Sequence, residues 1–137
     1  MQSNRMRTVA VAIGGTLLVL AAGCGSGTKS YDRYVPAAET ARSSLQAALD
    51  AWKQGLKPGK ITTVTPAVQV VDSVWQEGQK LGSYEILSDE AGDGPRWFSV
   101  RLKLAGSGAE QVVRYAVVGR DPIWVYREAD YKKATGM

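Results

Sequence analysis

Hydrophobic and polar residues follow three different patterns along this chain, and each pattern predicts a different structure. Residues 9–22 are uncharged and largely apolar. Between residues 37 and 52 the apolar positions recur every three or four residues, which is the period of an amphipathic helix. From Tyr84 onward the period changes to two, which is typical of half-buried β-strands. We therefore expect a leader-like segment, then one helix, then several strands.

The helical pattern has clear signals at both ends. Pro36 suits the first position of a helix, because its missing N–H would have no helical partner there. Gly55 offers the left-handed conformation that ends many helices, and Pro58 prevents resumption. The apolar stripe is Ala37, Ala41, Leu45, Ala48, Leu49 and Trp52. Since the opposite face is polar, we interpret the stripe as core-facing, with a partner-binding helix as the weaker alternative.

The second half of the chain alternates as an antiparallel sheet would. Residues 96–104 alternate most clearly, and residues 111–118 and 123–128 follow after glycine-rich turns. The predicted inner side chains of the first two segments are Phe98, Val100, Leu102, Leu104, Val113, Tyr115 and Val117. Residues 84–87 begin an earlier strand, and residues 56–66 form an irregular connector. One helix before a three- or four-stranded antiparallel meander predicts an α+β fold.

A run with period three lies between the connector and the strands. It consists of Asp72, Trp75, Gly78, Leu81 and Tyr84, after a β-branched patch at residues 68–71. Ser73 and Gln76 have the spacing of a capping box, which predicts a short helical turn ended by Gly78. We interpret Asp72 as a cap and Trp75 as a packing anchor. The alternative places both residues in a ligand site.

The apolar run near the start has the layout of a secretory signal. Arg5 and Arg7 precede it, and small residues end it just before Cys24, the single cysteine. The run is shorter than the roughly 20 apolar residues that a spanning helix needs, so a transmembrane anchor is the weaker alternative. Residues 20–24, Leu-Ala-Ala-Gly-Cys, resemble the lipobox of bacterial lipoproteins. This resemblance implies cleavage before Cys24 and acylation of its thiol, which leaves no disulfide.

These patterns divide the chain into four parts. We expect a signal peptide over residues 1–23, a lipidated cysteine and flexible tether over 24–35, a single α+β domain over 36–128, and a frayed polar tail over 129–137. Two acyl chains hold a protein stably on a bilayer. Gly25 stands where many inner-membrane lipoproteins carry aspartate, so the resemblance favours the outer membrane over the inner.

The domain also resembles a known group of folds. Two segments are similar to short exported bacterial proteins: D-x-x-W-x-x-G-x-x-L-x-x-Y-E-I from Asp72, and G-R-D-P-I-W-V-Y-R from Gly119. Their order after a helix resembles the cystatin-like and nuclear-transport-factor-like folds, in which a curved sheet wraps around a helix. That group hosts isomerases, dehydratases, inhibitors and interaction modules, so the resemblance does not select a function.

The composition argues against catalysis. The chain has no histidine, and its one cysteine is assigned to lipid. We therefore predict no catalytic residue, no cofactor and no metal site. Asp72 is the one acid whose apolar neighbours could raise its pKa enough for acid–base chemistry. A small-ligand enzyme or sensor, the alternative function, requires a pocket between helix and sheet that reaches Asp72 or Tyr115.

Binding is the favoured function. The chain's net charge is +4, but Arg5 and Arg7 belong to the predicted signal, and no long basic run suggests nucleic acid. The outward face of residues 96–104 carries an aromatic and basic patch, which residue 114 can join from the next strand: Trp97, Arg101, Lys103 and Arg114. Such a patch suits an anionic glycan, a lipid headgroup or an acidic envelope protein. An ordinary solvated sheet face is the simpler alternative.

Overall fold

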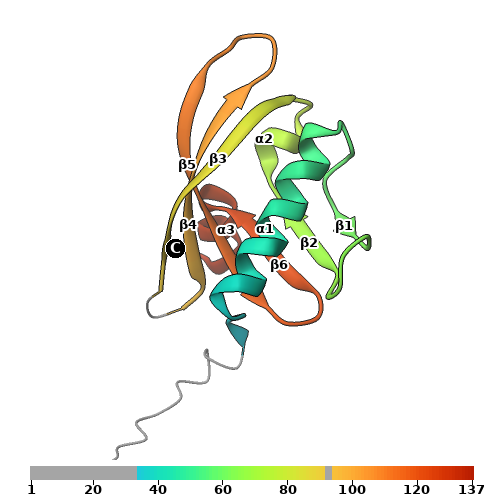
Figure 1. The fold of residues 1–137 in the computed structure, drawn as a ribbon. Coiled ribbons are helices and arrows are strands. Elements are labelled where there is room, and N and C mark those ends of the chain that lie inside the picture. The colour runs from blue at the N-terminus through green and yellow to red at the C-terminus, as the bar shows by residue number, and fades with distance from the viewer. Residues whose placement is uncertain (1–33, 92–93) are drawn as a thin grey trace, which may run out of the picture.

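The computed structural model describes residues 34–91 and 94–137, so the predictions for the signal peptide, for Cys24 and for most of the tether lie outside it. The elements are α1 (Ala38–Lys53), β1 (Lys60–Ile61), β2 (Val68–Val71), α2 (Ser73–Gln76), β3 (Leu81–Glu90), β4 (Arg96–Leu104), β5 (Glu110–Gly119), β6 (Ile123–Arg127) and α3 (Glu128–Thr135) (Figure 1). The predicted α+β class is confirmed.

The strands form one six-stranded sheet in the order β1-β2-β6-β5-β4-β3. Neighbouring strands are antiparallel except for β2 and β6, which run parallel. Strands β3 to β6 are the predicted antiparallel meander, but the predicted total of three to four strands is too low. The sequence misses β1 and β2 because both are too short to show alternation, and because β2 pairs with a strand from the other end of the domain.

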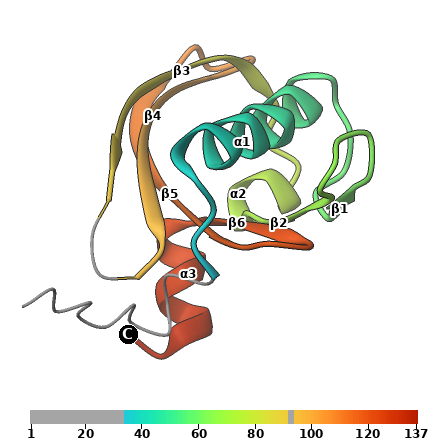
Figure 2. The same ribbon diagram turned by 60° about the horizontal axis from the view of Figure 1, so that its bottom comes forward.

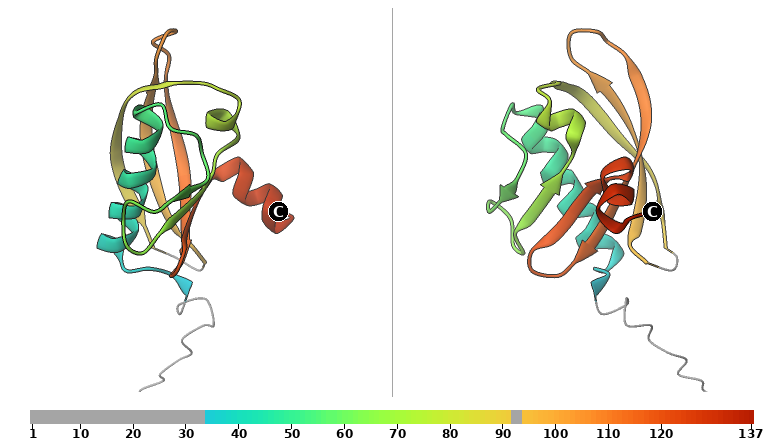
Figure 3. Two further views of the ribbon diagram at one scale, coloured as in Figure 1. Left: turned by 90° about the vertical axis from the view of Figure 1, so that its right-hand side faces the viewer. Right: turned by 180° about the vertical axis from the view of Figure 1, so that it is seen from behind.

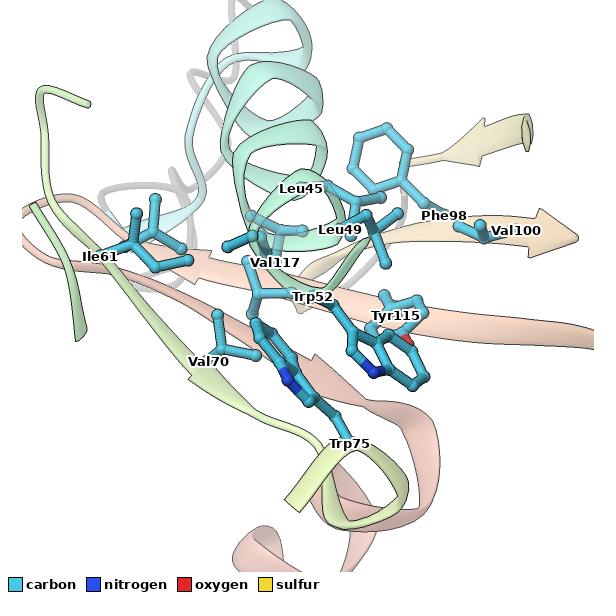
Figure 4. Close-up of a cluster of buried hydrophobic side chains, with 14 of the residues drawn as sticks. Leu45, Leu49, Trp52, Ile61, Val70, Trp75, Phe98, Val100, Tyr115 and Val117 are labelled. Atoms are coloured by element: carbon cyan, nitrogen blue, oxygen red, sulfur yellow. The ribbon is translucent and has the colours of Figure 1, made fainter. Parts of the chain in front are cut away.

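Helix α1 lies inside the curve of this sheet, as Figure 2 shows. Its buried positions include Ala41, Leu45, Ala48, Leu49 and Trp52, so the predicted apolar stripe faces the core from Ala41 onward, whereas Ala37 is exposed. The helix begins two residues after Pro36, because Ala37 has extended backbone angles and serves as the N-cap. The inner residues of β4 and β5 meet this stripe, with Phe98, Val100 and Tyr115 all buried (Figure 4).

The turn between β5 and β6 depends on Gly119. This residue has a φ of 96°, and a Cβ atom there would lie 2.8 Å from the carbonyl oxygen of Pro122. Glycine is therefore required at this position. The turn sets a register in which Tyr115 on β5 lies opposite Arg127 on β6.

The polar C-terminal segment, which we expected to fray, instead forms helix α3. It lies on the sheet face opposite α1 (Figure 3). Tyr131 packs edge-on against Trp97 and Tyr126, with ring centroids 5.3 and 5.7 Å apart. Asp130 accepts a hydrogen bond of 2.9 Å from the backbone N–H of Ser73. These tertiary contacts hold a segment whose composition alone gives no reason for order.

Candidate functional site

A groove with a volume of about 720 Å³ opens to solvent beside the C-terminal end of α1. One wall is the loop of residues 55–59, and another is residues 69–72 at the end of β2. The third wall comes from α2 and the loop before β3, through Gln76, Gly78, Gln79 and Lys80. Small-molecule sites in proteins occupy about 300–1,000 Å³, so the groove is large enough for a ligand of several rings.

Two stacked indoles form the floor of the groove. Trp52 and Trp75 both line it, are 2% and 5% exposed, and lie with their ring centroids 5.6 Å apart and their planes 15° from parallel (Figure 4). The Nε1–H of Trp52 donates to the Gln79 carbonyl at 2.7 Å, and that of Trp75 donates to the Leu56 carbonyl at 2.8 Å. Trp52 thereby joins α1 to the loop after α2, and Trp75 joins α2 to the loop after α1. The walls of the groove are therefore held in place without a ligand.

Asp72 lies at the edge of the groove but is almost completely buried. Its Oδ1 accepts hydrogen bonds from the backbone N–H groups of Val74 and Trp75, at 3.0 and 3.2 Å. Asp72 therefore caps α2, which is the structural interpretation that we favoured. The same Oδ1 also accepts from Nε of Arg127 at 2.8 Å, while Oδ2 accepts from the Tyr115 hydroxyl at 2.6 Å. Four donors already occupy the carboxylate that the alternative function requires as a base.

Arg127 is the residue of this cluster that sequence reasoning missed. It is 7% exposed, and it forms a buried ion pair with Asp72. The alternation along β6 indicates that Arg127 is buried, because Ile123 and Val125 face inward and the next inward position is this arginine. Its Nη2 atom is buried without a hydrogen-bond partner among the described residues. An arginine that ends an apolar inner face needs a buried anion, and Asp72 supplies it.

The stability of the fold should decline at alkaline pH because of Tyr115. Burial raises the pKa of Tyr115 well above its usual value, and the negative charge of Asp72 raises it further. The folded protein therefore keeps this proton at a pH where the unfolded chain, with a tyrosine pKa of about 10, has lost it. The contribution of Tyr115 to the free energy of unfolding is complete below about pH 10. Above that pH it falls by up to about 1.4 kcal/mol per pH unit.

Urea unfolding between pH 8 and 11 measures this decline, and Tyr115→Phe should make it shallower. Burial also raises the pKa values of Tyr84 and Tyr126, so the variant removes one share of the slope and leaves the rest. Tyr34→Phe, the same substitution at an exposed position before α1, is the matched control. A Tyr115→Phe slope identical to that of the wild type contradicts the assignment.

The predicted outer patch is divided by the structure. Trp97 and Arg114 are brought together, with the Arg114 Cζ 4.4 Å from the ring centroid of Trp97. Arg114 also pairs with Glu128 and Glu90. Trp97 and Arg114 of the patch are therefore already engaged in contacts within the molecule.

The remaining two residues of the patch lie farther along β4. Arg101 pairs with Glu85 of β3 at 2.9 Å, and Lys103 lies opposite Glu110 of β5 in the sheet register. Acidic residues of both neighbouring strands therefore flank these cations. A partner contact at any of the four patch residues stays a prediction.

Trp124 and Tyr126 belong to the same outer face. Their rings stack at 5.7 Å, and Tyr126 meets Tyr131 of α3. The outward aromatic residues therefore form one cluster with Trp97 and Tyr131, and this cluster holds α3 against the sheet.

Within residues 34–91 and 94–137 no three His, Cys, Asp or Glu side chains gather as a metal-binding group. No helix in the same part of the chain is long and apolar enough to cross a bilayer. No protein-family model matches the chain, and neither a curated protein nor a solved structure is significantly similar to it. The groove, with its indole floor and the buried cluster of Asp72, Tyr115 and Arg127 behind it, is the candidate site of this α+β domain.

Proposed function

We propose that this chain is a lipid-anchored binding protein of the cell envelope that acts without catalysis, through the groove. The anchor rests on the signal-like start and on residues 20–24 before the predicted acylation site at Cys24. The binding role rests on the groove. We also propose that the fold belongs with the cystatin-like and nuclear-transport-factor-like group, since a curved sheet wraps around one helix here as well (Figure 2).

The observation that carries the binding role is a groove whose walls are held by hydrogen bonds of its own floor. Ligands gain affinity when a site need not be ordered on binding, because the loss of conformational entropy is then smaller. Trp52 and Trp75 provide this rigidity through their bonds to Gln79 and Leu56. The groove is therefore built as a preformed receptor.

The placement of the groove suits a protein that is held at its N-terminal side. Helix α1 starts near the beginning of the described chain, as Figure 1 shows, and Trp52 near its C-terminal end lines the groove. Its 16 residues span about 24 Å at 1.5 Å per residue. An anchor attached before residue 34 would thus join the domain at the end of α1 that lies farther from the groove.

The alternative, a small-ligand enzyme or sensor, has one observation in its favour. The groove reaches Asp72, which is what that function requires. Against it stand the four hydrogen bonds that the carboxylate accepts and the pairing of its charge with Arg127. A sensor that binds without turnover remains compatible with this arrangement, whereas acid–base catalysis by Asp72 would require it to leave its partners.

The test uses full-length protein in detergent and an envelope extract separated into polysaccharide, lipid and protein fractions. One fraction should raise the unfolding temperature, since a ligand at about 100 times its Kd stabilises by about 2.7 kcal/mol. Gln79→Trp, which fills the groove from an exposed position, should abolish this rise. Gln111→Trp, at an exposed position of β5 outside the groove, should retain it.

Cys24→Ser supplies the second arm of the same test. This variant should be absent from the membrane fraction of cells. It should still respond to the ligand-containing part of the envelope extract as the wild type does. Membrane binding by Cys24→Ser would overturn the anchor. An unchanged response of Gln79→Trp would overturn the role of the groove.

A further inference from the structure

We infer that the ligand of the groove is an acidic glycan, whose anionic groups lie between Lys57 and Lys80. This inference rests on the proposed function and adds the chemical class of the ligand. Both lysines line the groove, Lys57 from the loop after α1 and Lys80 from the loop before β3. The two lysines stand on separate walls of the groove, so a ligand that lies between the walls can contact both.

The charge of the groove walls is positive. Among the described residues neither Lys57 nor Lys80 takes part in an ion pair. The lining contains one carboxylate, that of Asp72, and Arg127 neutralises it from behind. Glu77 lies next to the lining in sequence but is exposed and outside it. An anionic ligand would therefore find two cations and no competing free carboxylate in the lining.

The neutral groups of the lining suit hydroxyl-rich molecules. Gln69, Gln76 and Gln79 line the groove, and a side-chain amide both donates and accepts hydrogen bonds, as a sugar hydroxyl does. Three lining glycines, Gly55, Gly59 and Gly78, have open space where a Cβ atom would stand. A ligand can consequently approach the main chain at three places along the groove.

An acidic peptide fits this site less well than a glycan. Extended peptides commonly bind by adding a strand to a free sheet edge. The edge of β2 beside the groove is already engaged, because Val70 donates to the carbonyl of Gly59 at 2.9 Å and β1 pairs with the residues before it. The indoles of the floor are buried and offer little surface to a peptide side chain, although Leu56, Pro58, Val70 and Val71 add apolar surface to the walls. The two free cations and the side-chain amides of the lining therefore favour a ligand that combines carboxylates with hydroxyl groups.

The test compares galacturonic acid trisaccharide with its neutral galactose counterpart, titrated into full-length, isotope-labelled protein in detergent and followed by backbone amide NMR. The acidic sugar should shift the amides of residues 55–59 and 76–80, and the neutral sugar should bind at least tenfold more weakly. Lys57→Gln with Lys80→Gln should weaken acidic binding about tenfold. The matched pair Lys132→Gln and Lys133→Gln, at exposed positions of α3, should leave it unchanged. Added salt should also weaken binding of the acidic sugar to the wild-type protein.

The failures are distinguishable. Equal binding of both sugars at the groove amides overturns the acidic class and leaves the binding function intact. Tighter binding of triglutamate, or of vesicles of anionic phospholipid, at those amides overturns the glycan. Absence of shifts with either sugar also overturns the inference, while the extract experiment with Gln79→Trp decides separately whether the groove binds anything.

Discussion

Asp72→Asn should destabilise the domain by about 3–5 kcal/mol, because it leaves Arg127 as a buried cation without a counter-charge. The ion pair joins side chains that are 1% and 8% exposed, so water cannot take over the role of the carboxylate. Small domains are stable by about 5–15 kcal/mol, so this loss would remove a large part of the stability of the domain. Urea unfolding monitored by circular dichroism measures it directly.

Two further variants separate the buried charge from other effects. Glu85→Gln removes the partner of Arg101 from an exposed ion pair and should cost less than about 1 kcal/mol. Combining Asp72→Asn with Arg127→Met should recover much of the loss, since no charge is then left unpaired. A cost for Asp72→Asn similar to that of Glu85→Gln would mean that the pair does not support the fold.

Because Asp72 supports the fold, its substitution affects stability as well as any binding by the groove. Asp72→Ala would remove the cap of α2 together with the partners of Arg127 and Tyr115. Loss of binding in that variant would therefore follow from loss of structure. Substitutions at exposed groove positions, such as Gln79, test the site without this complication.

Trp52→Ala should cost about 3–5 kcal/mol, the range for truncating a large buried aromatic side chain. Trp52 is among the largest fully buried side chains in the described part of the chain. The change would remove its stacking on Trp75, create a cavity under the groove, and leave the Gln79 carbonyl without its indole donor. Since the indole also joins two walls of the groove, affinity for the ligand should fall along with stability.

Trp124→Ala is the matched control, because it is the same substitution on the half-buried outer face. We expect it to cost at least about 2 kcal/mol less than Trp52→Ala, given the smaller loss of buried area. Thermal and urea unfolding of the two variants provide the comparison. Equal losses would show that Trp52 does not carry the packing that its burial indicates.

The sequence predicted the local elements well where a strong period acted over many residues. The apolar stripe from Ala41 to Trp52 yields α1, and the alternation over residues 96–104 coincides with β4. Both patterns arise because one face of an element must be buried, which is a property of the segment itself. The capping role of Asp72 was likewise legible, since an N-cap acts on neighbours two and three residues away.

The site was less predictable because its parts are distant in sequence. Asp72 and Trp75 were singled out, but Arg127 was not, since its meaning depends on the parallel pairing of β2 with β6. Lys57, Gln79 and Lys80 give no signal in sequence, because exposed polar loop residues are common. Only the bonds from Trp52 to Gln79 and from Trp75 to Leu56 turn those loops into the walls of a groove.

By itself the sequence determined an apolar leader-like run, the α+β class, the core-facing stripe and the antiparallel meander, because periodicity and capping are local consequences of burial. Tertiary structure decided the parallel pairing of β2, the ordering of α3, the ion pair of Asp72 with Arg127, and the groove. Each of these depends on contacts between segments far apart in the chain, and the energy of such a contact is set by burial and geometry that no single segment contains.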